Sequence, residues 1–325
     1  MREKLLEVLA EPITGAPLRL KAGEGSGDRI ESGSLVSDKT GKEYPIVRGI
    51  PRFVEGATYA DSFGMQWNKF RGSQVDSITG HDHSRQRFDA ETEWTEVDLK
   101  GKWVLDAGCG AGRFAEIAAA RGPDLVALDY SSAVEAAKVN LAPFPNADVV
   151  QGNLLEPPFR AGAFDYAYCI GVIQHTPDPH KVTVNVVRCV RQGGHFALTI
   201  YARRPWSKLN SKYLLRPFTK KMPQEQLLSV IEKVMPVAFP IADRLYGIPV
   251  VGRVAKFVLP VANYDRKDFS LEQRYEEAVL DTFDMLAPQY DSPMTWREVE
   301  AAFREAGATR WDFRDTVPIH VIGTR

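Results

Sequence analysis

The sequence predicts an α/β fold built on a seven-stranded, mostly parallel sheet, with a helical insertion after the fifth strand and a small β-rich appendage at the N-terminus. Three observations predict it. Between residues 101 and 200, apolar strand-like runs alternate with helical periodicity, as in a parallel sheet with helices on both faces. The first run, "KWVLDAG", leads into a glycine-rich turn. A proline-rich stretch then interrupts the pattern, and two more strand-like runs close the chain.

Shifts in composition divide the chain into five expected parts. The first is rich in Gly and Ser with short β-like pieces, and the second is polar and aromatic. The parts are a β-rich appendage (1–55), a helical lid or linker (56–100), a ligand-binding core (101–200), a helical insertion or cap (201–290) and the end of the core (291–325).

Composition limits the class of protein. The 325 residues are 44% hydrophobic and 26% charged, which suits one large domain or two smaller ones. A net charge of −1 argues against a general polyanion binder, although local basic patches remain open. Cys109, Cys169 and Cys189 lie far apart, which indicates a reducing compartment without a disulfide framework or zinc site. The N-terminus lacks the apolar run of a secretory signal and no stretch reaches 18 apolar residues, so we expect a cytoplasmic protein.

Capping residues give the expected helix boundaries. A helix after the glycine turn should run from about Ala111 to Arg121 and end at Gly122. Three pairs have the spacing of a capping box that opens a helix: Ser132 with Glu135, Ser270 with Gln273, and Thr295 with Glu298.

The last third of the chain combines short helices with a terminal hairpin. Seven prolines between residues 205 and 260 predict that the helices there are short. The helix that opens at Thr295 carries Trp296, Val299 and Phe303 at helical spacing and should end at Gly307. The runs "TRWDFRD" and "VPIHVIGT" predict an antiparallel hairpin at the sheet edge.

Gly108, Gly110 and Gly112 lie in "VLDAGCGAGRF", where a ligand can approach main chain and a helix N-terminus. A P-loop is excluded because no Gly-Lys-Ser/Thr follows. A dinucleotide fingerprint would have its third glycine where Arg113 stands, which counts against a nicotinamide or flavin enzyme without excluding it. Asp129, at the end of the second strand, could bind the ribose hydroxyls of any adenosine-containing ligand.

Further motifs follow the glycine run in a fixed order. Asp106 precedes it, Asp129 ends the next strand, and "QGNLLEPPF" and "GVIQHTPDP" follow the third and fourth strands. This set resembles the class I S-adenosylmethionine-dependent methyltransferases, closely over residues 100–200 and loosely over "MTWREVEAAFREAGA" and the last two strands. The resemblance implies a Rossmann-like methyltransferase sheet, S-adenosylmethionine as cofactor, S-adenosylhomocysteine as product, and no metal. It says little about the acceptor.

The resemblance also implies a cofactor site. The glycine turn would hold the methionine moiety, with Asp106 near its ammonium group. Asp129 would bind the ribose hydroxyls and Tyr130 would pack near the adenine. Many relatives have Asp at the position of Asn153, where an amide can still reach adenine. The implied residues are Asp106, Gly108, Cys109, Gly110, Gly112, Asp129, Tyr130, Asn153, Leu154, Ile170 and Arg87.

The segment "LLEVLAEPITGAPLRL" and the later "GSLVSDKTGKEYPIVRGIPRFVE" suggest a second likeness. Residues 1–55 resemble the small zinc-ribbon-type domain that precedes or activates some methyltransferases. Its relatives carry cysteine pairs near "EPITGAP" and "VSDKTGKEYP", and this chain has none there. The resemblance therefore implies a degenerate, metal-free copy that is stabilised by packing and serves for docking or structure.

Methyl transfer requires alignment of the reactants and, for a hydroxyl acceptor, removal of a proton. His175, at the end of "GVIQH", is the candidate base or acceptor-orienting group, and the alternative is a histidine that only shapes the pocket. Tyr290 is the second catalytic candidate, and Asp284 is a further one. His81 and His83 form an H-x-H pattern that invites a metal, but exposed loop histidines are the preferred interpretation.

Residues before the first core strand could close the pocket. Gln66 and Trp67 in "FGMQWNKF" could form a lid over the acceptor, although a helical tryptophan is more often core. Gln174 is a third substrate-binding candidate. Arg87 could pair with the methionine carboxylate, and a surface salt bridge is an equally good interpretation.

The insertion allows three hypotheses. Residues 201–223 contain seven basic residues and no acidic one, and an apolar stretch broken by prolines follows. It could be a cap that admits a bulky apolar or anionic acceptor, or a helical subdomain that packs on the sheet or on the second subunit of a homodimer. It could also bind a membrane peripherally through anionic headgroups. The first two are compatible and are preferred to the third.

The sequence thus predicts methyl transfer from S-adenosylmethionine to a small or medium-sized organic acceptor, first of all at oxygen, with nitrogen and carbon left open. An RNA or tRNA methyltransferase is one alternative, against which the near-neutral charge and the lack of a recognisable RNA-binding module count. A catalytically inert, cofactor-binding partner subunit is the other, against which the intact "DAGCGAG" and Asp129 count.

Overall fold

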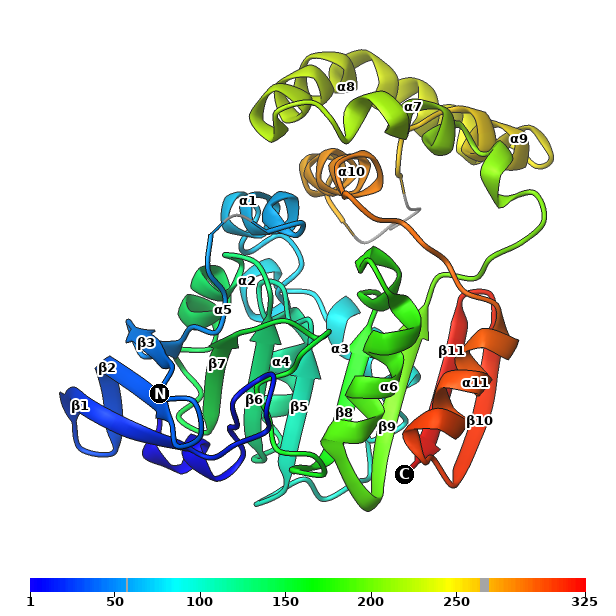
Figure 1. Cartoon of the computed structure of the whole chain (residues 1–325). Coiled ribbons are helices and arrows are strands. Elements are labelled where there is room, and N and C mark those ends of the chain that lie inside the picture. Colours follow the sequence, from blue (N-terminus) through cyan, green and yellow to red (C-terminus); the bar gives the residue numbers. More distant parts are fainter. Residues whose placement is uncertain (57, 264–268) are drawn as a thin grey trace.

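The computed structural model describes residues 1–56, 58–263 and 269–325, which form two sheets and a helical cap (Figure 1). The larger sheet has the strand order β10-β11-β9-β8-β5-β6-β7. Its strands are β5 (Trp103–Ala107), β6 (Asp124–Asp129), β7 (Ala147–Gln151), β8 (Phe164–Ile170), β9 (Val190–Ile200), β10 (Arg310–Thr316) and β11 (Ile319–Thr324). Strands β5 to β9 pair in parallel, whereas β11 is antiparallel to both neighbours. The expected seven-stranded sheet is confirmed.

Helices cover both faces of this sheet. One face carries α3 (His83–Thr92), α4 (Arg113–Ala119) and α5 (Val134–Asn140), and the other carries α6 (Pro179–Cys189) and α11 (Trp296–Ala306). The central strands are therefore buried on both sides, which explains their nearly continuous apolar sequences.

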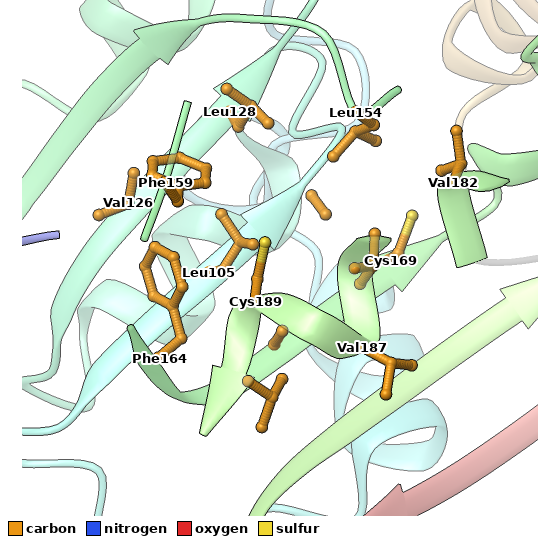
Figure 2. Close-up of a cluster of buried hydrophobic side chains, with 14 of the residues drawn as sticks. Leu105, Val126, Leu128, Leu154, Phe159, Phe164, Cys169, Val182, Val187 and Cys189 are labelled. Carbon is orange, nitrogen blue, oxygen red and sulfur yellow. The ribbon is translucent and has the colours of Figure 1, made fainter. Parts of the chain in front are cut away.

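Figure 2 shows the core on the α6 side. Side chains from three neighbouring strands meet two phenylalanines and the inner face of α6. The labelled residues are Leu105, Val126, Leu128, Leu154, Phe159, Phe164, Cys169, Val182, Val187 and Cys189. All three cysteines of the chain are buried and free, so they act as small apolar side chains.

The N-terminal segment forms a four-stranded antiparallel sheet that packs on the larger one. It contains the 3-10 helix η1 (Glu3–Glu7) and strands β1 (Leu18–Ser26), β2 (Arg29–Ser37), β3 (Glu43–Val47) and β4 (Ile50–Pro51). Residues 152–163, between β7 and β8, contain no helix. Leu5 and Leu9 share one core with Leu128, Val150 and Phe159, so this segment covers the part of the sheet that a crossover helix would otherwise cover.

The cap follows β9 and lies above the carboxyl ends of the strands (Figure 1). Its helices are η3 (Ser207–Leu209), α7 (Ser211–Thr219), α8 (Gln224–Tyr246), α9 (Val251–Val258) and α10 (Leu271–Leu286). Two further helices, α1 (Asp61–Lys69) and α2 (Asp76–Thr79), precede the core. The insertion after the fifth strand is confirmed.

The expectation that the cap helices are all short is wrong for α8. This helix has 23 residues and contains Pro236 and Pro240. Each proline removes one helical hydrogen bond. The helix continues because Ile231, Met235 and Phe239 pack along its inner side into a core shared with α10.

Two of the three expected capping boxes are confirmed, those of Ser270 with Gln273 and Thr295 with Glu298. The third, Ser132 with Glu135, is wrong. Helix α5 begins at Val134 without a side-chain cap, and the Ser131 hydroxyl instead accepts from the Ala133 amide. Glu135 instead forms ion pairs with Arg48 and Arg52, 2.6 Å each, because the turn between β3 and β4 and the residue after β4 lie beside it.

Two other helix expectations need adjustment. Helix α4 spans Arg113–Ala119, shorter than expected, and Gly122 follows with a φ of +81°. In α11, Val299 and Phe303 are buried and Gly307 ends the helix at a φ of +80°, but Trp296 is exposed because it lies in the first turn.

A buried charge cluster joins the N-terminal segment to the large sheet. The Arg2 guanidinium donates to Asp124 at 2.6 Å and to Asp148 at 2.7 Å, at the starts of β6 and β7. The Arg2 main-chain amide also donates to Asp148, at 2.7 Å. Removing one partner of a buried ion pair leaves the other charges uncompensated.

We expect Arg2→Met to lower the free energy of unfolding by up to about 3–5 kcal/mol, because Asp124 and Asp148 lose the guanidinium that they share and keep only Lys4, at 2.7 Å, and Arg29, at 3.8 Å. Denaturant titration followed by fluorescence measures it. Arg19→Met is the matched control, since Arg19 pairs with Asp38 at the exposed surface and should cost at most about 1 kcal/mol. Equal losses for both variants would contradict the role given to the buried cluster.

Candidate active site

A cavity of about 750 Å³ lies between the carboxyl ends of the strands and the cap. Strand order reverses at β5, between β6 and β8, and open parallel sheets bind ligands at such a switch point. The floor comes from the turn after β5 and the ends of β6 and β8. The walls and roof come from α1, α3, α7 and α10.

The turn after β5 is formed by glycines in the left-handed region. Gly108, Gly110 and Gly112 have φ values of +92°, +53° and +88°. A Cβ on Gly108 would lie 2.6 Å from the Val172 side chain, and one on Gly110 would lie 3.0 Å from the Trp67 indole nitrogen. A side chain at either position would therefore be strained by the backbone conformation and would crowd Val172 or Trp67.

Hydrogen bonds tie this turn to the end of β6. The amides of Gly108 and Cys109 donate to the Leu128 carbonyl at 2.8 and 2.9 Å, and the Gly110 amide donates to Asp129 at 2.9 Å. The other Asp129 oxygen accepts from the amide and the hydroxyl of Ser131. Burial raises the pKa of Asp129, against which these hydrogen bonds act. Its carboxylate lies on the cavity wall.

Most residues named for the cofactor lie together on this side of the cavity. Those that line it are Gly108, Cys109, Gly110, Asp129, Tyr130, Leu154, Ile170 and Arg87. Tyr130 also packs on Tyr59, with ring centroids 4.9 Å apart. Arg87 is engaged by Glu91 at 2.6 Å, and Glu91 lines the cavity too.

Three of the named residues lie behind the wall. Gly112 provides the N-cap position of α4, and the Asn153 side chain accepts from the Leu155 amide at 2.9 Å. Asp106 is 2% exposed on β5. Burial raises its pKa to about 8, against which the neighbouring Tyr168 hydroxyl acts.

His175 lies in the 3-10 helix η2 (Ile173–His175) after β8 and lines the cavity. Its Nδ1 is 3.2 Å from the Tyr290 carbonyl oxygen, which can only accept a hydrogen bond. We therefore assign the proton of the neutral ring to Nδ1, which leaves Nε2 with a free lone pair. The rings of Phe63 and Tyr201 meet His175 edge-on at 5.2 and 5.5 Å.

Tyr290 and Gln174 have other positions than expected. Tyr290 provides its main-chain carbonyl to His175, while its ring packs against Tyr59 at 5.4 Å. Gln174 is fully buried, and its amide donates to the Gly171 carbonyl at 2.6 Å and accepts from the Tyr201 amide. Neither side chain lines the cavity in the described part of the chain, so both fix the loop around His175.

Gln66 and Trp67 line the cavity from α1, on the lid side where they were expected. Gln66 is 1% exposed and Trp67 packs over Gly110. His81 and His83 are only half-exposed, because both pack against Phe269 at 4.3 and 4.9 Å. Among the described residues, no group of three His, Cys, Asp or Glu side chains could hold a metal ion.

The roof contains Asp284, which the sequence offered as a further catalytic candidate, and three polar residues to which sequence reasoning gave no role in the site: Lys212, Asp281 and Asp291. Lys212 of α7 pairs with Asp291 at 2.7 Å, and Asp281 and Asp284 project from α10 into the same cavity. Burial raises the pKa of Asp284, against which Lys212 and, when it is protonated, His175 act. The sequence did contain one signal for this pair. Asp281 and Asp284 are three residues apart, which places both carboxylates on the same face of one helix, beside apolar positions.

A family model and curated relatives both name methyl transfer. Residues 105–198 match the family model of a methyltransferase domain, and residues 1–55 lie outside that match. The chain is 31% identical over 169 residues to a ubiquinone biosynthesis O-methyltransferase of Dechloromonas aromatica, covering 49% of this chain and 71% of the relative.

Other matches are partial. A ubiquinone biosynthesis O-methyltransferase of Acinetobacter baumannii is 31% identical over 38% of this chain and 55% of the relative, so the chain spans about half that relative's length. The crystal structure of an S-adenosylmethionine dependent methyltransferase from Mesorhizobium loti is 22% identical, with a TM-score of 0.31 over 36% of this chain and 53% of that one.

The raised pKa of Asp106 predicts a pH-dependent stability. Its pKa is 3.8 in an unfolded chain and about 8 in the fold, so the native state prefers the neutral acid. This contribution is fully present below pH 4 and is lost as pH rises through about 8. We expect Asp106→Asn to abolish it, so that the variant's stability relative to wild type increases across this range by on the order of 5 kcal/mol.

Thermal or denaturant unfolding at several pH values measures the difference. Asp312→Asn, at an exposed position on β10, is the control. Its free energy of unfolding should change with pH in the same way as that of wild type. Parallel curves for Asp106→Asn as well would contradict a neutral Asp106.

Proposed function

This chain belongs to the class I S-adenosylmethionine-dependent methyltransferases, and we propose that it methylates a small or medium-sized organic acceptor at oxygen. The proposal rests on one cavity of about 750 Å³ that has the glycine turn as its floor, the cap as its roof and His175 on its wall. This volume is in the range of small-molecule sites. The name of the curated relatives, O-methyltransferase, supports oxygen as the methylated atom.

The glycine turn fits S-adenosylmethionine, because Gly108, Cys109 and Gly110 bring main chain to the cavity wall beside the Asp129 carboxylate. We assign the methionine moiety to this turn and the ribose hydroxyls to Asp129. An ionised carboxylate has about four lone-pair sites, so Asp129 can accept from a ribose while it holds Gly110 and Ser131. Tyr130 and Leu154 provide the adenine walls.

S-adenosylmethionine, when bound, supplies a methyl group on a positively charged sulfur. His175 can act as general base, since its Nε2 has a free lone pair and the ring is held by the Tyr290 carbonyl. The role of Nε2 would be to accept the proton of the acceptor hydroxyl. Phe63 and Tyr201 hold the imidazole plane, and the roof aligns the acceptor.

The roof favours an acceptor with an apolar body and a polar substituent. Leu280, Met285 and Phe63 provide apolar wall, whereas Lys212 and Asp284 are charged or polar groups at the same surface. Lys212 is held by Asp291, so its ammonium is fixed before any ligand enters. A preorganised cation of this kind suits a hydroxyl, phenolate or carboxylate on the acceptor.

We also propose that residues 1–55 are a structural element of the same unit. Their apolar side chains share the core of the large sheet, and Arg2 joins them to Asp124 and Asp148.

We expect His175→Asn to lower kcat by about a hundredfold or more, because the base is lost while an amide can still donate to the Tyr290 carbonyl. The affinity for S-adenosylhomocysteine should stay unchanged. His180→Asn is the control, since His180 pairs with Glu305 on the exposed side of α6. Unchanged kcat for His175→Asn, measured under single-turnover conditions, would remove His175 from proton transfer.

The acceptor class is tested by transfer of a labelled methyl group from S-adenosylmethionine to four panels: hydroxylated aromatics, hydroxy acids, amines and RNA. We expect the label in a methyl ether or methyl ester formed from a compound of one of the first two panels. This label should remain under conditions that cleave the sulfonium of unreacted S-adenosylmethionine. Label in the amines or the RNA alone would contradict O-methylation of a small acceptor.

A further inference from the structure

Helix α8 has two apolar sides, and only one is covered. Its inner side packs into a core with α10. Its outer side carries a second apolar row that is 44–67% exposed: Val230, Val234, Val237 and Ile241. At 3.6 residues per turn these four lie within an arc of about 60°. The insertion was expected to pack its apolar faces on the sheet or on a second subunit, whereas the inner row of α8 packs on α10 within the cap and the outer row is uncovered within this chain.

The neighbouring cap helices extend the exposed apolar surface. Helix α9 presents Val251, Val254 and Val258, which lie within another arc of about 60°. Helix α7 presents Leu214 and Phe218, the latter 72% exposed. The three helices form the outermost layer of the cap, on the side of α10 away from the sheet (Figure 1). We call the exposed apolar residues of α7, α8 and α9 the cap outer face.

An exposed surface of this kind is uncommon on a monomer. Single exposed valines need no explanation, but rows on three adjacent helices mark a site of interaction. Two of these rows repeat at helical spacing, so the surface is a property of the helices and not of a loose loop.

The cap outer face is accompanied by positive charge. Residues 211–258 contain eight Lys and Arg against three Asp and Glu, in a chain with a net charge of −1. Six of the eight are exposed and form no ion pair within the described residues: Lys220, Lys221, Lys233, Arg244, Arg253 and Lys256. On α8, Lys233 and Arg244 border the apolar row on one side.

From these observations we propose that the cap outer face binds the surface of an anionic lipid bilayer, with α7, α8 and α9 lying in the interface. Apolar rows would enter the acyl boundary while the cations meet the headgroups. Of the described residues, none belongs to a helix both long and apolar enough to cross a bilayer, so the chain would lie on the membrane. This inference does not depend on the proposed acceptor.

Charge argues against a second copy as the occupant. Two copies that met through this face would bring twelve exposed cations together, whereas an anionic membrane complements them. The same argument excludes a basic partner protein. A lipid surface is also fluid, so it can adapt to the apolar rows of α7, α8 and α9 without a matching shape.

Co-sedimentation of the full chain with vesicles tests the proposal. We expect binding to vesicles of equimolar phosphatidylcholine and phosphatidylglycerol, much weaker binding to pure phosphatidylcholine, and partial release by salt. Val234→Asp with Val237→Asp should lower the partition coefficient at least about tenfold. Lys220→Ala with Lys221→Ala should lower it roughly thirtyfold, since each cation near the surface contributes about fivefold.

The control is Ile13→Asp with Val139→Asp, two exposed apolar residues outside the cap, which should bind as wild type does. Unchanged thermal midpoints show that the variants are folded. Sedimentation velocity without vesicles tests the alternative, in which two copies of the chain form a dimer through the cap outer face. Absence of binding to anionic vesicles, or a dimer that Val234→Asp with Val237→Asp dissociates, would overturn the proposal.

Discussion

The site depends on one constraint, the pair of hydrogen bonds from Gly108 and Cys109 to the carbonyl of Leu128. They fix the turn after β5 against the end of β6, and a third bond from Gly110 then orients Asp129. The left-handed conformation of the glycines and the packing of Val172 against Gly108 leave no room for side chains there. The turn therefore offers bare backbone beside a carboxylate, which is what a ligand with an amino-acid end and a ribose requires.

Two additions adapt this common core. The N-terminal sheet covers a face of the large sheet where the connection from β7 to β8 has no helix, and Arg2 fastens it to Asp124 and Asp148. The cap converts an open cleft into a roofed cavity. It has an inner side built for packing on α10 and an outer side that combines apolar rows with cations. One insertion thus roofs the cavity on one side and exposes an apolar surface with cations on the other.

Local signals predicted the fold well. Strand–helix alternation gave the sheet, and the spacing of Ser270 and Thr295 from their partners gave two helix starts. Where tertiary contacts compete, the prediction failed. Glu135 was drawn to arginines of the N-terminal sheet instead of capping α5, and packing on α10 carried α8 through two prolines.

The same contrast between local signals and tertiary contacts explains which residues of the candidate site could be predicted. Residues of the glycine turn, Asp129 and His175 follow strands in a fixed order, so sequence could identify them. Lys212 and Asp291 lie far apart in the chain and meet only in the folded roof. The most direct test of the cofactor is calorimetric titration with S-adenosylhomocysteine and NADH, for wild type and Asp129→Ala. We predict binding of S-adenosylhomocysteine alone, lost in the variant, whereas binding of NADH alone, or undiminished binding by Asp129→Ala, would contradict the account.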